Sequence, residues 1–216
     1  NRGKQGVRRD DDGCVRDIPV FLGNRKHLGL RQRYLPGKDL DALNAHGAVA
    51  GLCGGQADNG VGASGVASAR NVTVSFRDYI ANVASSEVYP TWPEQALRAN
   101  IHCQISLALN RIYTEWYPSK GYTFNITNST SYDQYYVHGR TVFEVMVRIT
   151  DDIFNTYLRK RGTVNPYYSE YCDGKSVTCP GLKQWGTVTL ANNGRSALQI
   201  LRYYYGVSSA RSFTDT

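Results

Sequence analysis

The sequence predicts an α+β fold, in which a helix pair that carries the candidate catalytic residue packs on a small mixed β-sheet. Its 216 residues, of which 41% are hydrophobic and 20% charged, suffice for one packed core and exclude two large domains. Strand-like alternation and helical periodicity occur in turn along the chain, and no fixed repeat is visible. No apolar run approaches the roughly 18 residues that a membrane span needs, so we expect no membrane-spanning segment.

Residues 1–70 differ in composition from the rest of the chain. Gly and Ala dominate the stretch 45–70, which contains no large aromatic residue. Such a stretch offers little core material and is costly to order. We therefore interpret 1–70 as an arm or linker of unassigned role, with one short strand at 18–22, and 71–216 as the functional domain.

A strand followed by two helices is predicted after residue 71. Apolar and polar residues alternate over 72–76, and the apolar residues of 77–88 then recur at helical spacing. The first helix must end before Pro90, because a proline disfavours helical geometry in the residue that precedes it. Thr91 and Glu94 have the spacing of a capping box, which predicts that a second, long helix begins there and continues to residue 117.

The remaining segments are shorter. Residues 122–137 are rich in Thr, Asn, Ser and Tyr, which favours an exposed strand and loop. The apolar spacing of 142–158 predicts a third helix. Residues 172–179 have the composition of a turn, and a last helix over 197–205 should stop at Gly206.

Charge and aromatic content narrow the possible partners. The sixteen Tyr and three Trp residues favour a partly solvated binding groove, because both side chains combine an aromatic ring with a polar group. The net charge of +7 indicates an anionic partner, such as a nucleic acid or the acidic polymers of a bacterial wall. The basic clusters, at 8–9, 25–33 and 159–161, lie beside neither a helix-turn-helix nor an RNA-recognition motif. We therefore expect no nucleic-acid partner.

Glu87 is the strongest candidate for chemistry. It lies in the last turn of the first helix, where the negative end of the helix dipole disfavours a carboxylate. Its neighbours Val88, Tyr89 and Trp92 form an apolar and aromatic setting that would raise its pKa into the range of a general acid or base. An exposed carboxylate at a frayed helix end is the alternative. Glu94 has a structural role as half of the capping box.

The sequence patterns for a paired-carboxylate site, an acyl-transfer site and a zinc site are weaker than the pattern at Glu87. Asp151 and Asp152 have Arg residues nearby in sequence, which favours a solvated face. The chain has no G-x-S-x-G elbow, so acyl transfer is disfavoured. Cys172 and Cys179 have no matching His, so the spacing favours a disulfide or two free thiols over a zinc site.

Two blocks resemble the stage II sporulation protein D and amidase-enhancer family. The first block is YIANVASSE (79–87) followed by Pro90 and WPEQALRA (92–99). The second comprises GLKQWG (181–186), LANNG (190–194) and ILRYYYG (200–206). The resemblance covers about 71–207 and leaves 1–70 outside.

The resemblance implies a lytic transglycosylase that cleaves peptidoglycan glycan strands already stripped of stem peptides. The family's catalytic acid and base falls on Glu87. One carboxylate suffices for this chemistry, because the C6 hydroxyl of the sugar replaces water and closes a 1,6-anhydro ring. Tyr89, Tyr171, Gln184 and Trp185 are the candidate walls of the glycan groove. The resemblance also implies an extracytoplasmic location and a cell-wall amidase as a possible partner.

The chain departs from the family pattern at three positions. Arg98 keeps the charge of the usual Lys and stays a candidate for substrate binding, but Ile105 replaces an Arg on the same helical face. Some members bind zinc through a His and two Cys, and here Pro166 occupies the position of that His. We therefore assign no metal and no cofactor. The lost Arg is compatible with an alternative, a catalytically weak wall-binding module that enhances a separate amidase.

Overall fold

A computed structural model describes residues 71–160 and 163–206 with their side chains, and the backbone alone of 8–9, 15–16, 48–50, 52–53 and 209–212. The described residues form an α+β fold, which confirms the predicted class. The strand expected at 18–22 lies outside the described residues.

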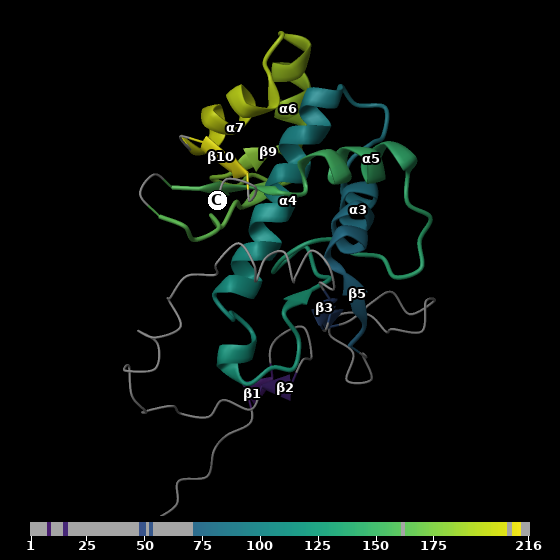
Figure 1. Cartoon of the computed structure of the whole chain (residues 1–216), viewed down its shortest axis with the longest axis vertical. Coiled ribbons are helices and arrows are strands. Elements are labelled where there is room, and N and C mark those ends of the chain that lie inside the picture. Colours follow the sequence, from purple (N-terminus) through teal and green to yellow (C-terminus); the bar gives the residue numbers. More distant parts are fainter. Residues whose placement is uncertain are drawn as a thin grey trace, which may run out of the picture.

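The long helix α4 (Glu94–Tyr113) is the centre of the fold (Figure 1). Helices α3 (Phe76–Glu87) and α5 (Glu144–Ile153) pack against one side of it. Helices α6 (Gln184–Asn192) and α7 (Ala197–Tyr205) also pack on α4, and α6 lies near its N-terminal end. A short 3-10 helix, η2 (Pro118–Lys120), follows α4 at the opposite end.

Helix α4 is buried on two sides because it contributes to two apolar clusters. The larger cluster joins α3, α4 and α5 through the fully buried Ile80, Ile101, Ile105, Met146 and Ile149. The smaller cluster joins α4 to α7 and to the strand before α6, through Cys103, Leu182, Ile200 and Leu201. A helix buried on both sides can also position polar side chains inside the protein, and α4 does so with Asn100, Gln104 and Ser106.

The strands form two-stranded pairs. The antiparallel pairs are β1 (Arg8–Arg9) with β2 (Val15–Arg16), β3 (Ala48–Ala50) with β5 (Thr73–Ser75), and β7 (Thr156–Arg159) with β10 (Ser209–Ser212). The parallel pairs are β4 (Leu52–Cys53) with β6 (Ile126–Thr127) and β8 (Tyr171–Cys172) with β9 (Leu182–Lys183). Two strands of the 1–70 arm thus pair with strands of the 71–216 segment.

The helix ends follow local signals, with one exception. Ser75 caps α3 by accepting a hydrogen bond from the Asp78 N–H, and Ser196 forms a capping box with Gln199 at the start of α7. Helix α7 ends at Gly206, as predicted. The capping box predicted for α4 is wrong: its N-cap residue is Pro93, and the Glu94 carboxylate binds two arginine side chains instead.

The predicted helix over 142–158 is too long. Helix α5 ends at Ile153, and residues 156–159 form β7, which pairs with β10 some fifty residues later in the chain. The long helix is also shorter than expected, since α4 ends at Tyr113 rather than at residue 117. None of the helices in the described part of the chain combines the length and apolar character that crossing a membrane requires.

Candidate active site

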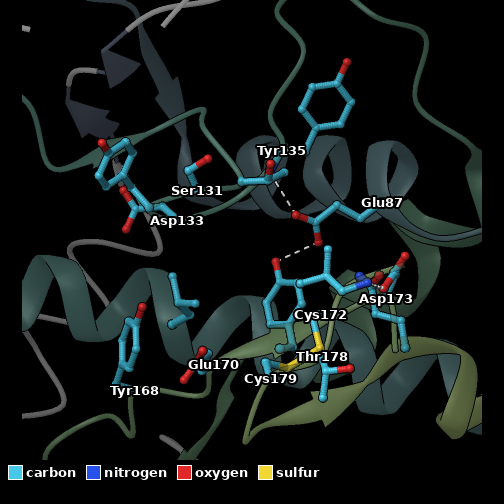
Figure 2. Close-up of a pocket in the computed structure, with 16 residues that line it drawn as sticks. Glu87, Ser131, Asp133, Tyr135, Tyr168, Glu170, Cys172, Asp173, Thr178 and Cys179 are labelled. Atoms are coloured by element: carbon cyan, nitrogen blue, oxygen red, sulfur yellow. Dashed lines mark hydrogen bonds between the residues drawn. A yellow bond between two sulfur atoms is a disulfide. The ribbon is translucent and has the colours of Figure 1, made fainter. Parts of the chain in front are cut away.

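Glu87 is the last residue of α3, and the chain turns to extended geometry at Val88. Its carboxylate accepts three hydrogen bonds. Oε2 accepts from the Tyr171 hydroxyl at 2.6 Å and from the Gln104 side-chain amide at 2.8 Å. Oε1 accepts from the backbone N–H of Tyr135 at 2.8 Å. Figure 2 shows the bond from Tyr135 to Glu87. Tyr171 reaches the carboxylate from a different segment of the chain.

The surroundings of Glu87 favour its protonated form. Burial raises the pKa of this carboxyl to about 7, and the hydrogen bonds from Tyr171, Tyr135 and Gln104 only partly oppose this effect. All three donors are uncharged, so the carboxylate does not gain the stabilisation that a neighbouring Arg or Lys would give. The group can therefore both donate and accept a proton near neutral pH.

The carboxyl group lies on the wall of an open pocket with a volume of about 590 Å³. Five segments form its walls (Figure 2). They are the end of α3, the loop at 130–135, the segment 168–171, the disulfide loop 172–179 and the start of α6. Its lining is mostly hydroxyl, carboxyl and aromatic: Glu87, Leu107, Thr130, Ser131, Tyr132, Asp133, Tyr135, Tyr168, Glu170, Tyr171, Cys172, Asp173, Val177, Thr178, Cys179 and Gln184.

A buried chain of polar groups orients the Tyr171 hydroxyl. The Gln134 side-chain amide donates to this hydroxyl at 3.1 Å and accepts a hydrogen bond from the Tyr79 hydroxyl at 2.9 Å. Gln134 also donates to the backbone carbonyl of Gln104. The Gln104 side-chain oxygen, in contrast, is buried with no hydrogen-bond partner among the described residues. Because this oxygen belongs to the amide that donates to Glu87, it is an additional hydrogen-bond acceptor close to the carboxyl group.

A disulfide between Cys172 and Cys179 closes the loop that forms one wall of the pocket. Inside the loop, the Asp173 carboxylate accepts hydrogen bonds from the Ser176 hydroxyl and from the backbone N–H groups of residues 175–177. These bonds hold the pKa of Asp173 well below its usual range. Of the two states that the sequence leaves open for these cysteines, the structure has the disulfide.

The predicted groove residues fall into two groups. Tyr171 and Gln184 line the pocket, and Tyr171 also binds the catalytic candidate directly. Tyr89 and Trp185 are not among the lining residues. They form an aromatic cluster with Trp92, in which the Trp92 and Trp185 rings are 4.8 Å apart and Tyr89 lies 5.8 and 5.9 Å from them.

Arg98 is not brought to the pocket. Its guanidinium donates to Glu94 at 2.8 Å and to Asp152 at 2.6 Å, in a surface network that also contains Arg148. Asp151 forms an exposed ion pair with Arg77 of α3. The solvated face expected for the two adjacent aspartates is therefore confirmed, and Arg98 belongs to it.

Besides Asp173 of the disulfide loop, two more pocket carboxylates were missed by sequence reasoning, Asp133 and Glu170. Asp133 is buried, and its oxygens accept from Arg111, Tyr117 and Thr127, which leaves it a structural role. Glu170, by contrast, is exposed to the pocket. Neither has a local signature, because the fold brings them close to Glu87 from segments 46 and 83 residues away.

The side chains of Cys103 and His102 are not suited to nucleophilic catalysis. Burial raises the pKa of the Cys103 thiol to about 12 and lowers that of His102 to about 4. Within 71–160 and 163–206, no group of three or more His, Cys, Asp or Glu side chains is arranged to hold a metal ion.

Comparisons with protein-family models, with curated proteins and with solved structures give no match to this chain.

Proposed function

We propose that the chain is a lytic transglycosylase that cleaves peptide-stripped peptidoglycan strands, with Glu87 as general acid and base. One observation carries this proposal: a carboxyl group with its pKa raised to about 7 lies on the wall of an open pocket. A residue that must first give a proton and then take one back needs both forms to be accessible at the working pH.

The reaction uses one carboxyl group in two steps. Protonated Glu87 gives its proton to the glycosidic oxygen while the bond from that oxygen to the anomeric carbon breaks. The resulting carboxylate takes the proton of the C6 hydroxyl of the same sugar, whose oxygen attacks the anomeric carbon and closes the 1,6-anhydro ring. Glu87 is then protonated again, and no water is consumed. Oε1 is the better proton carrier, because it accepts one hydrogen bond where Oε2 accepts two.

The position of the two sequence blocks also supports the proposal. The first block comprises α3 and the start of α4, and the second comprises β9, α6 and α7. They meet where Trp92 packs on Trp185 and where the Gln95 side chain accepts a hydrogen bond from the Ala197 N–H at 2.8 Å. Residues that are far apart in sequence but adjacent in space are expected of one shared site.

Hydrolysis is the second candidate, because Glu170 provides a second carboxylate in the same pocket. A hydrolytic glycosidase needs such a group to activate water or to form a glycosyl intermediate. The loop disulfide favours the extracytoplasmic location that either reaction on the cell wall requires.

Mass spectrometry of a peptide-free glycan digest in ¹⁸O-labelled water tests the proposal. A lytic transglycosylase yields 1,6-anhydro ends without label, and Glu170→Gln leaves the rate within a few-fold of the unsubstituted protein. Labelled reducing ends, together with a Glu170→Gln variant that does not cleave, would establish hydrolysis instead. Glycan binding with no cleavage, combined with stimulation of an added amidase, would establish the enhancer alternative.

A further inference from the structure

Lys175 lies over an aromatic cluster beside the pocket. Its ammonium nitrogen is 3.3 Å from the centroid of the Trp185 ring. The same indole packs against Trp92 and Tyr89, and the Tyr89 side chain is 59% exposed. The Lys175 ammonium and the exposed Tyr89 ring therefore both contact the Trp185 indole, next to the loop that forms a wall of the pocket.

The loop holds this lysine in place. Lys175 lies between the two cysteines of the disulfide, and its backbone N–H donates to the Asp173 carboxylate at 3.0 Å. The backbone carbonyl of Asp173 in turn accepts a hydrogen bond from the backbone N–H of Trp185 at 3.1 Å, which connects the loop to the start of α6. Gly174 has a φ of +76°, and a Cβ there would overlap the Lys183 side chain. The ammonium thus lies on a constrained loop.

The two lysines near this loop have different partners. The Lys183 ammonium donates to the backbone carbonyls of Cys179 and Gly181, so its donors are used inside the protein. The Lys175 ammonium contacts the indole ring and has no hydrogen-bond or ion-pair partner among the described residues. Because an ammonium has three donors and a ring face uses none of them fully, Lys175 can bind an anion.

We propose that Lys175, Tyr89, Trp92 and Trp185 form a binding subsite for a sugar that carries a carboxylate. The amphipathic rings would stack on the sugar, and the ammonium would bind its carboxylate. This inference rests on the proposed function for the identity of the sugar. A muramyl residue without its stem peptide exposes a lactyl carboxylate, whereas attachment of the stem peptide converts that carboxylate into an uncharged amide. Lys175 would then make the protein distinguish stripped from unstripped strands.

Binding to two glycans tests the subsite without depending on cleavage. Full-length Glu87→Gln protein is titrated calorimetrically with peptide-free glycan and with a chitooligosaccharide of equal length, which has a similar N-acetylated backbone but no carboxylate. We expect tighter binding of the peptide-free glycan. Lys175→Met keeps the aliphatic stem and should weaken that binding by about 2- to 5-fold, the range of an exposed ion pair, and leave the chitooligosaccharide unchanged. Tyr89→Ala should weaken both ligands.

Lys120→Met is the matched control. The Lys120 ammonium lies 3.5 Å from the centroid of the Trp116 ring, which is the same kind of contact, but Lys120 belongs to η2, which follows the C-terminal end of α4. Its loss should change neither titration.

Four results would overturn the inference. The Glu87→Gln protein could bind the two glycans equally or bind neither of them, or the preference could be unchanged in Lys175→Met. Lys175→Met could also lose as much affinity for a single-stranded oligonucleotide as for the peptide-free glycan, which would indicate a general anion site. Failure of the proposed function would appear separately, as no anhydro product from the unsubstituted protein.

Discussion

Glu87 and Glu94 lie seven residues apart, at the end of α3 and at the start of α4. The surroundings of Glu87 raise its pKa to about 7, because burial outweighs three uncharged donors. Glu94 is exposed and its pKa is lowered, chiefly by the hydrogen bond from Arg98 and then by that from Arg148. Two chemically identical carboxyl groups therefore have opposite properties within one short stretch of chain.

The comparison separates a carboxyl group suited to proton transfer from one held in surface ion pairs. Glu94 is at a helix N-terminus, where the dipole and two arginines keep it ionised. Glu87 is at a helix C-terminus, where the dipole disfavours the charge and the last turn of α3 contains no basic residue. The uncharged donors from Tyr171, Gln104 and Tyr135 orient the group without fixing its protonation state, which suits an acid that must also serve as a base.

Glu87→Gln should have the largest effect. The amide has nearly the same shape but transfers no proton, so cleavage of peptide-free glycan should fall by about 100- to 10,000-fold, the range of general acid–base assistance. Binding of the glycan, measured by pull-down, should be retained. A variant that cleaves at the unsubstituted rate would show that Glu87 is not the proton donor.

Stability should depend on pH through the same residue. Glu87 has a folded-state pKa of about 7 against an ordinary value of 4.5, so the folded protein binds more protons between these two pH values. Its free energy of unfolding should then fall as pH rises through this window, by on the order of 1 to 3 kcal/mol from Glu87 alone.

Glu87→Gln should lose this component. The difference in the free energy of unfolding between the variant and the unsubstituted protein, from urea denaturation at pH 5 and pH 8, measures it. A difference that does not change with pH would mean that Glu87 has an ordinary pKa.

Tyr171→Phe should shift the pH dependence of activity. The substitution removes a donor to the Glu87 carboxylate, so the pKa of Glu87 should rise further, by about one unit for one hydrogen bond to a charged group. The alkaline limb of kcat/KM, where the acid form is lost, should move to higher pH by the same amount. Tyr168→Phe, a pocket tyrosine whose hydroxyl accepts from Arg111, should leave the midpoint in place.

Glu94→Gln should have the smallest effect. It weakens exposed ion pairs with Arg98 and Arg148, which are worth a few tenths of a kcal/mol each. Thermal denaturation should show a minor loss of stability, and glycan cleavage should be unchanged. Loss of cleavage in this variant would reverse the roles of the two carboxyl groups.

Much of the helical framework could be predicted because its signals are local. Gly206 ends α7 by its own backbone preference, and Pro90 limits how far α3 can extend. The apolar spacing identifies the buried face of α3 and one of the two buried sides of α4. The end of α5 could not be predicted in this way. Its apolar residues at 153, 154 and 157 fit a helix, but pairing with β10 makes 156–159 a strand, and such pairing has no local signature.

The site was predictable in part for the same reason. The position of Glu87 at a helix end among apolar neighbours correctly indicates a raised pKa. The groups that contact its carboxylate are different from those neighbours. Tyr135 and Tyr171 lie 48 and 84 residues away in the sequence, whereas the Tyr89 ring packs against Trp92 and Trp185 and stays partly exposed. Long-range packing also brings Glu170 into the pocket.

A carbon-13 NMR titration of the glutamate carboxyl groups tests the central claim most directly. Glu87→Gln and Glu94→Gln spectra assign the two resonances by their absence. We predict a midpoint of about 7 for Glu87 and one below 4.5 for Glu94. Equal midpoints near 4.5 would contradict the account, because Glu87 would then be a solvated carboxylate with no proton to give at neutral pH.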